Sequence, residues 1–347
     1  YFTVMGTDVA SPAMRAFSVR PAREVLREGH FAMKSLTAGD GGTVSIQGRT
    51  TVLNGSILAG GLPGSRGGTL ALSGQNVLVG QSGASLPEGF DFGTPLPAEL
   101  RGTLLLDASG LSGRGFSELL LGDLAVTETV TLLGGSVLEA TSVTLAARNA
   151  VFLQEGAEIR ATGAGGTASL LSPAGTVSLA QGSVLHATDS ISLDAQSLSL
   201  QGRILVDQST LNLASDRIFV VPGSYTGSTT DGLYITEALW GAFSDMEDIV
   251  LTGRTDISFL GPVDVTAGQS LTINAPRIAG VRLDGISSVA LTAPEVRILN
   301  TGAASTDSGL TDSGLLNVSA ERIFVGHGNT LLDGFSRVVL GAENDLT

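Results

Sequence analysis

The sequence predicts an all-β protein, a right-handed parallel β-helix (β-solenoid) of about 15 short coils interrupted by a few loop excursions. Glycine supplies 47 of the 347 residues, while charged residues make up only 15% and hydrophobic residues 42%. This composition is typical of many short strands joined by tight turns. A ten-residue pattern also recurs along the chain, and a third short alternating segment often follows it, so each coil is expected to hold three strands.

The recurring unit has the form apolar-x-apolar-x-small-x-x-apolar-x-apolar. Alternation places one set of side chains inward, and the small residue lets the backbone bend between the two halves. Clear copies begin at Leu70, Ile191, Leu211, Leu271, Val289 and Leu316. The side chains predicted to point inward and to stack between coils are Leu72, Val77, Leu193, Leu198, Leu213, Ile218, Ile273, Ile278, Leu291, Val296, Val318 and Ile323.

The pattern divides the chain into an N-terminal junction or cap, residues 1–35, and a β-helix, residues 36–347. A short helix is predicted within Arg15 to Arg27, where charged and apolar positions alternate, although Pro21 disfavours it. Stretches rich in Pro, Gly or polar residues predict excursions near 81–102, 222–248 and 300–314.

The units that begin at Leu271, Val289 and Leu316, together with the phrase Asp231-Gly-Leu-Tyr-Ile235, resemble the repeats of filamentous haemagglutinin-like exoproteins. That family comprises large β-helical bacterial proteins exported by two-partner secretion. The resemblance implies a passive, extended adhesin or surface-fibre scaffold, secreted or held at the bacterial cell surface. It also implies an outer-membrane transporter and host or cell-surface glycans as partners. Asn-Pro-Asn-Gly-type export signals of the family are absent from this sequence.

The charge distribution bears on partners. The formal net charge is −14, with 33 acidic and 19 basic residues, and Lys34 is the single lysine. A protein that binds nucleic acid needs clustered Lys and Arg, so we expect no nucleic-acid partner. No apolar run is long enough to cross a membrane as a helix, and we expect no membrane insertion. The absence of cysteine excludes disulfides and thiol catalysis.

Catalytic motifs are weak. Gly326-His327-Gly328 and Asn300-Thr301 resemble parts of polygalacturonase-type glycosidase motifs, but Gly302 stands where that family has Asp, and no Asp-Asp pair occurs. Glycosidases need two carboxylates at the scissile bond. We therefore predict no catalytic residue and no enzyme activity, with His327 in a turn. A β-helical polysaccharide hydrolase or lyase is the alternative.

Metal and cofactor sites are not expected either. The histidines His30, His186 and His327 are widely dispersed. Asp245, Glu247 and Asp248, and separately Asp307 and Asp312, are alternatives for Ca²⁺ binding, but their spacing matches no EF-hand, and solvated loops are preferred.

The sequence offers one candidate ligand-binding surface. Trp240 and Tyr234 in the 222–248 excursion are candidates for a sugar-stacking platform, which would make the chain a carbohydrate-binding module. The preferred alternative is that these rings pack the excursion onto the β-helix. Single arginines occur about once per unit and are expected to be solvated: Arg203, Arg217, Arg277, Arg297 and Arg322.

The function predicted is structural: a non-catalytic section of an exported fibre or adhesin that acts by rigid extension and surface display. The chain starts at Tyr1 and is still in strand pattern from Phe335 to Thr347. We therefore expect a mature product or an internal piece, with a longer chain or head-to-tail self-association continuing the stack.

Overall fold

The computed structural model describes residues 2–7, 16–21, 23, 39–53, 57–61, 64–80, 97–207, 210–225, 227, 231–243, 246–283, 287–302, 314–326 and 328–347. The chain divides into two units, Tyr1–Ala38 and Gly39–Thr347. The boundary predicted between residues 35 and 36 lies outside the described residues.

In the first unit, β1 (Phe2–Thr7) pairs antiparallel with β2 (Ala16–Pro21), and Phe2 is opposite Pro21. The helix predicted within Arg15 to Arg27 is therefore wrong for the residues of β2. The alternation of Phe17 and Val19 with polar neighbours has the period of a strand, and a proline at the strand end does not interrupt a ladder. Arg23 is helical, and residues 24–38 lie outside the described residues.

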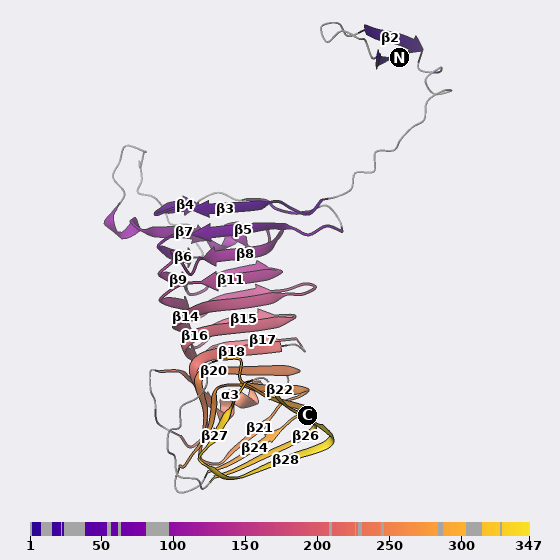
Figure 1. Cartoon of the computed structure of the whole chain (residues 1–347). Helices are drawn as coiled ribbons and strands as arrows, with labels where there is room; N and C mark the ends of the chain where they lie inside the picture. The colour runs from indigo at the N-terminus through magenta and orange to yellow at the C-terminus, as the bar shows by residue number, and fades with distance from the viewer. Residues whose placement is uncertain are drawn as a thin grey trace. The chain divides into compact units, whose positions relative to one another are not determined.

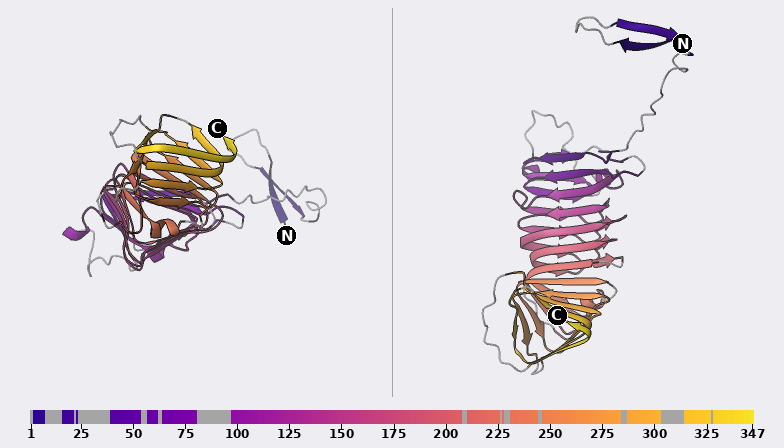
Figure 2. Two further views of the ribbon diagram at one scale, coloured as in Figure 1. Left: turned by 90° about the horizontal axis from the view of Figure 1, so that it is seen from below. Right: turned by 45° about the vertical axis from the view of Figure 1, so that its right-hand side comes forward.

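The second unit is all-β, with mostly parallel strands and few helices (Figure 1). Strands one repeat apart in the sequence pair in register, for example Thr43 with Thr69, Ser142 with Thr167 and Ser190 with Thr210. These pairings arrange the strands in three columns, and Figure 2 shows the arrows of successive strands stacked in order. The colour gradient in both figures follows the chain through the stack.

Up to residue 274 the first column carries the first half of the repeat, and from residue 295 onward it carries the second half. Its strands are β3 (Thr43–Gln47), β5 (Gly68–Ser73), β8 (Phe116–Gly122), β11 (Ser142–Ala146), the first halves of β14 (Thr167–Leu179), β16 (Ser190–Leu200), β18 (Thr210–Val221) and β20 (Asp248–Leu260), then β22 (Ser270–Asn274), β25 (Glu295–Leu299), and the second halves of β26 (Gly314–Gly326) and β28 (Phe335–Leu346).

Up to residue 281 the second column carries the second half of the repeat, and two further strands in it lie out of chain order. The column runs β4 (Thr51–Leu53), β7 (Thr103–Asp107), β6 (Asn76–Gly80), β9 (Thr129–Leu132), β12 (Ala150–Leu153), the second halves of β14 and β16, β19 (Leu233–Thr236), the second halves of β18 and β20, β23 (Arg277–Val281) and β27 (Leu331–Asp333). The chain turns back after β6, so that β7 lies between β4 and β6. It does the same after β18, so that β19 lies between the second halves of β16 and β18.

The third column consists of two stacks. The first contains β10 (Val137–Ala140), β13 (Glu158–Ala161), β15 (Val184–Ala187) and β17 (Arg203–Val206). The second contains β21 (Val263–Thr266), β24 (Ser288–Thr292) and the first halves of β26 and β28.

A short helix follows each inserted strand and contacts the first strand of a third-column stack. Helix α2 (Ala108–Leu111) is capped by Asp107 at its N-terminus. Ser112, which follows the helix, donates its hydroxyl to the carbonyl of Val137 and accepts a hydrogen bond from the N–H of Glu139, both on β10. Helix α3 (Glu237–Gly241) is capped by Thr236, and its Trp240 donates to the carbonyl of Thr266 on β21. These contacts satisfy edge groups of both stacks.

The core lies between the columns and is mainly aliphatic, with a few buried aromatic rings such as Phe243 and Phe259. All twelve side chains predicted to point inward are at most 5% exposed, which confirms that prediction. They stack in register: Leu193 lies beside Leu213 on β18, and Leu213 lies beside Leu251 on β20. Because each level presents similar side chains at the same position, the levels bury a continuous apolar interior.

Small residues occupy the bend between the first and second columns, as the repeat predicts. Ala195 and Ser215 are fully buried there, and the Ser215 hydroxyl donates to the carbonyl of Gln196 in the preceding level at 2.8 Å. At the bend after β8, Gly122 has a φ of +87°, and a Cβ would lie 2.1 Å from the carbonyl oxygen of Ala146. No other residue fits that position without displacing the backbone.

The described residues give twelve levels in the first column, fewer than the 15 coils predicted. The inserted strands account for part of the difference, since they use chain without adding a level to that column. The 222–248 stretch contains β19 and α3 rather than loop alone, and residues 97–102 include the 3₁₀ helix η1 (Ala98–Leu100). Residues 81–96 and 303–313 of the other predicted excursions lie outside the described residues.

Candidate functional site

The two predicted ligand-binding residues lie in different environments. Tyr234 projects from β19 into a row of three half-buried aromatic rings. Its ring centroid is 4.7 Å from that of Phe219 on β18 and 6.0 Å from that of Tyr225, and both pairs are nearly parallel. Burial raises the pKa of Tyr225, and the charge and hydrogen bonding of Tyr234 raise it further. The three rings stack on one another, so that Tyr225 packs against the second column.

Trp240 does not share that surface. It is only 6% exposed, donates its indole N–H to Thr266 at 3.0 Å, and meets Phe243 edge to face at 6.3 Å. Its ring is therefore not available to stack on a sugar. Of the two alternatives for Trp240, packing of the excursion against the strands is the one observed.

The candidate metal ligands are not assembled. Among the residues that the structure describes, no group of three His, Cys, Asp or Glu side chains is placed to hold a metal ion. Glu247 is exposed, and Asp248 accepts a hydrogen bond from Ser270 at 2.5 Å. Asp245, Asp307, Asp312, His30 and His327 lie outside the described residues. The remaining histidine, His186, lies 3.3 Å from a carboxylate oxygen of Asp207.

A line of alternating charges crosses four strands of the second column. Asp256 on β20 is 4% exposed and lies 3.3 Å from Arg277 and 3.7 Å from Arg217. Arg277 in turn donates to Asp333 on β27 at 2.9 Å. Arg277 was predicted to be solvated, and this prediction is wrong, because its side chain is 14% exposed and lies between two buried carboxylates. These groups balance one another's charge within the stack.

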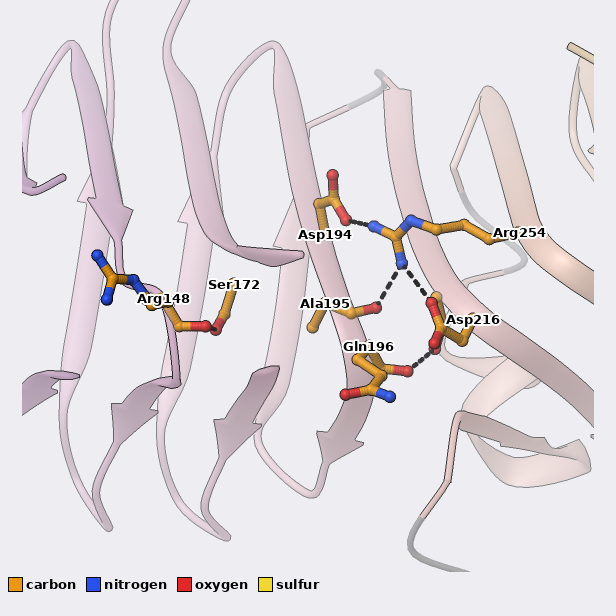
Figure 3. A network of polar contacts seen from close by, with 8 residues as sticks. Arg148, Ser172, Asp194, Ala195, Gln196, Asp216 and Arg254 are labelled. Carbon is orange, nitrogen blue, oxygen red and sulfur yellow. Dashed lines mark hydrogen bonds and ion pairs between the residues drawn. The ribbon is translucent and has the colours of Figure 1, made fainter. Parts of the chain in front are cut away.

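Arg254 joins three successive levels at the bend between the columns (Figure 3). It pairs with Asp194, lies 3.3 Å from Asp216, and donates to the carbonyl of Ala195 at 3.0 Å. The two aspartates precede Arg254 by 60 and 38 residues. The cluster ties three successive levels together.

A hollowed surface with several charged side chains lies on the outer side of the first column, over β20, β22, β25 and β26. Two adjoining hollows of about 370 and 650 Å³ share Glu295, Arg297 and Arg322. We call this surface the outer groove. Its other lining residues are Thr210, Asp248, Val250, Gln269, Ser270 and Thr272 on one side, and Leu299, Ile323, Phe324, Asp345 and Thr347 on the other.

The centre of the outer groove is a glutamate held between two arginines. Glu295 pairs with Arg297, two residues along β25, and its second oxygen lies 2.9 Å from Arg322 on the neighbouring strand. The Glu295 side chain is 16% exposed, whereas that of Arg322 is 62% exposed. The pairing orients both guanidinium groups in the lining of the groove, and both arginine side chains stay more than half exposed.

Sequence reasoning missed this cluster because it treated Arg297 and Arg322 as isolated, solvated residues. They meet because Glu295 is opposite Arg322 and Arg297 is opposite Phe324 in the parallel register. Alignment of the unit at Val289 with the unit at Leu316 contains this signal, since the two segments place these residues at equivalent positions.

Comparison of the chain with protein-family models, with curated proteins and with solved structures gives no match. A membrane-spanning segment is not found among the described helices, none of which has the required length and apolar character.

Proposed function

We propose that this chain is a section of a right-handed parallel β-helix that serves as a non-catalytic scaffold in a secreted or cell-surface bacterial exoprotein. The observation that carries the proposal is the in-register parallel pairing of strands one repeat apart, over twelve levels of one column among the described residues. Each level is hydrogen-bonded to the next and shares its apolar interior, an arrangement suited to rigid extension.

The ionisable clusters support a structural role. Arg254 bridges levels, and Arg277 and Arg217 balance the charges of Asp256 and Asp333. The resemblance to filamentous haemagglutinin-like repeats supplies the expectation of export and surface display. A chain of net charge −14 is also well suited to stay soluble while it presents a long β-surface.

The location is tested on intact cells of the bacterium that produces the protein. Antibodies raised against the chain should label unpermeabilised cells or detect the protein in the medium, while a cytosolic marker stays unlabelled. Detection in the cytosolic fraction alone would contradict the proposal.

The architecture is tested by a crystal structure of residues 1–347. We expect the three columns to follow one another in a right-handed turn around one interior. A left-handed succession, or columns that belong to separate packed sheets, would overturn the β-helix assignment.

A further inference from the structure

We propose that the outer groove binds an uncharged oligosaccharide that runs across the strands of the first column. This inference goes beyond the scaffold role, because it assigns a ligand to one face of the stack and holds wherever the protein is displayed.

The groove repeats at the spacing of the strands. Parallel register places one lining residue per level in a single row: Thr210, Asp248, Ser270, Glu295, Arg322 and Asp345. Adjacent levels in a sheet are about 4.8 Å apart. This spacing is close to the length of one sugar residue in an extended glycan. Successive sugars therefore meet successive levels, each of which offers a polar side chain.

The chemistry of the row fits hydroxyl groups. A sugar hydroxyl donates one hydrogen bond and accepts others, so it needs both acceptors and donors nearby. The carboxylates of Asp248, Glu295 and Asp345 accept, the guanidinium groups of Arg297 and Arg322 donate, and the serine and threonine hydroxyls do both. The contacts of Glu295 with both arginines fix these donors before any ligand arrives, which lowers the entropic cost of binding.

The charge of the lining argues for an uncharged ligand. The three carboxylates outnumber the two guanidinium groups in the groove, and the chain as a whole carries −14. A polyanionic glycan would therefore be repelled by the protein, and Glu295 already offsets part of the positive charge of the two arginines.

Phe324 adds an aromatic face at one end of the groove. Its side chain is 37% exposed, and its ring lies against Gly326, where an added Cβ would come within 2.6 Å of Cζ. The ring therefore lies along the strand, close to the backbone of Gly326. An aromatic face in this position stacks on the apolar C–H face of a sugar ring, as polar edge groups bind its hydroxyls.

The test is isothermal titration of the full chain with hexasaccharides of glucose, mannose, xylose and N-acetylglucosamine, and with hexagalacturonate as the anionic probe. We expect at least one uncharged hexasaccharide to bind, and Phe324→Ser and Arg322→Gln each to weaken that binding about tenfold or more. Gly326→Ala, which displaces the ring without removing any lining side chain, should also weaken it.

Two variants outside the groove are matched controls. Phe152→Ser removes another outward phenylalanine of similar exposure, and Arg160→Gln removes the arginine of a second Glu-x-Arg pair, with Glu158 on β13. Both should leave binding unchanged. The melting temperature of every variant is measured. If Phe324→Ser does not fold, Arg322→Gln still tests the proposal, because Arg322 is exposed and its replacement leaves the core intact.

The proposal is overturned if no uncharged hexasaccharide binds, if hexagalacturonate binds more tightly than all of them, or if the control variants lose as much affinity as the groove variants. Cleavage of a bound hexasaccharide would contradict the non-catalytic scaffold while leaving the binding site intact. Absence of the protein from the cell surface would contradict the scaffold's location alone.

Discussion

At the scale of the residue, the inward aliphatic side chains are the positions on which the stability of the second unit depends most directly. Full burial of one such side chain contributes about 1.5–3 kcal/mol relative to exposure. Ile218 is fully buried and lies in register between Leu233 on β19 and Ile257 on β20. A polar group at such a position has no hydrogen-bonding partner above or below it.

We predict that Ile218→Asp lowers the free energy of unfolding by several kcal/mol, because it buries an unpaired charge. Leu205→Asp is the control, since Leu205 is also a large aliphatic residue on a strand but is 37% exposed, and it should change stability by less than about 1 kcal/mol. Urea unfolding followed by circular dichroism measures both. Equal stability of the two variants would mean that the inward and outward faces of the repeat are misassigned.

At the scale of the element, buried ion pairs link strands that are distant in sequence. Asp256 holds Arg277 on the next strand of the second column, and Arg277 reaches Asp333 on the strand after that. Removal of one partner from such a set leaves a buried charge without its counterion, which costs far more than loss of a surface pair.

Asp256→Asn should therefore lower the free energy of unfolding by about 3 kcal/mol. This is the lower end of the cost of breaking a buried ion pair, because Arg277 still has Asp333 as a partner in the variant. Glu158→Gln breaks the exposed pair with Arg160 and should cost less than about 1 kcal/mol. Chemical denaturation of both variants at pH 7 gives the comparison. A cost for Asp256→Asn no larger than that for Glu158→Gln would show that the buried charges do not stabilise the stack.

The short helices also stabilise the packing of elements, since Trp240 of α3 donates a hydrogen bond to Thr266 at the edge of β21. Trp240→Ala should cost about 3–5 kcal/mol, from the cavity that it leaves and from the Thr266 carbonyl that loses its donor. Phe152→Ala, at an exposed ring, should cost less than about 1 kcal/mol. Thermal unfolding measures both. If the Trp240→Ala protein melts at the wild-type temperature, the packing role assigned to this ring is wrong.

At the scale of the molecule, negative charge opposes association of exposed strand surface. Several apolar side chains on β26 and β28 are exposed, among them Leu315, Val325, Val338 and Leu346. The chain carries −14 at pH 7 and has an isoelectric point near 4.5. Mutual repulsion is therefore strong at neutral pH and vanishes near the isoelectric point.

We predict that the protein stays dispersed at pH 7 in low salt and self-associates as the pH falls toward about 4.5. Light scattering across this range, with a return to pH 7 to test reversibility, measures the effect. The double variant Val338→Lys, Leu346→Lys should associate less than the wild type. The two proteins are compared at pH values that give them the same net charge. Association that is independent of pH would contradict a charge-controlled mechanism.

The sequence by itself determined which side chains form the core and where the chain bends. Alternation is a local property with the period of a strand, so residues such as Leu193 and Ile273 could be assigned to the interior without knowledge of their neighbours. The small residues at the bends follow from local backbone geometry in the same way.

Only the tertiary structure decided which side chains meet across levels. Glu295 and Arg322 come together through register, and Arg254 reaches Asp194 across two levels. The return of β7 and β19 to positions beside earlier strands depends on non-local pairing, which no local pattern encodes. The outer groove, the buried charges and the place of Trp240 all follow from those pairings, because each joins residues that are far apart in the chain and adjacent only when the levels are stacked.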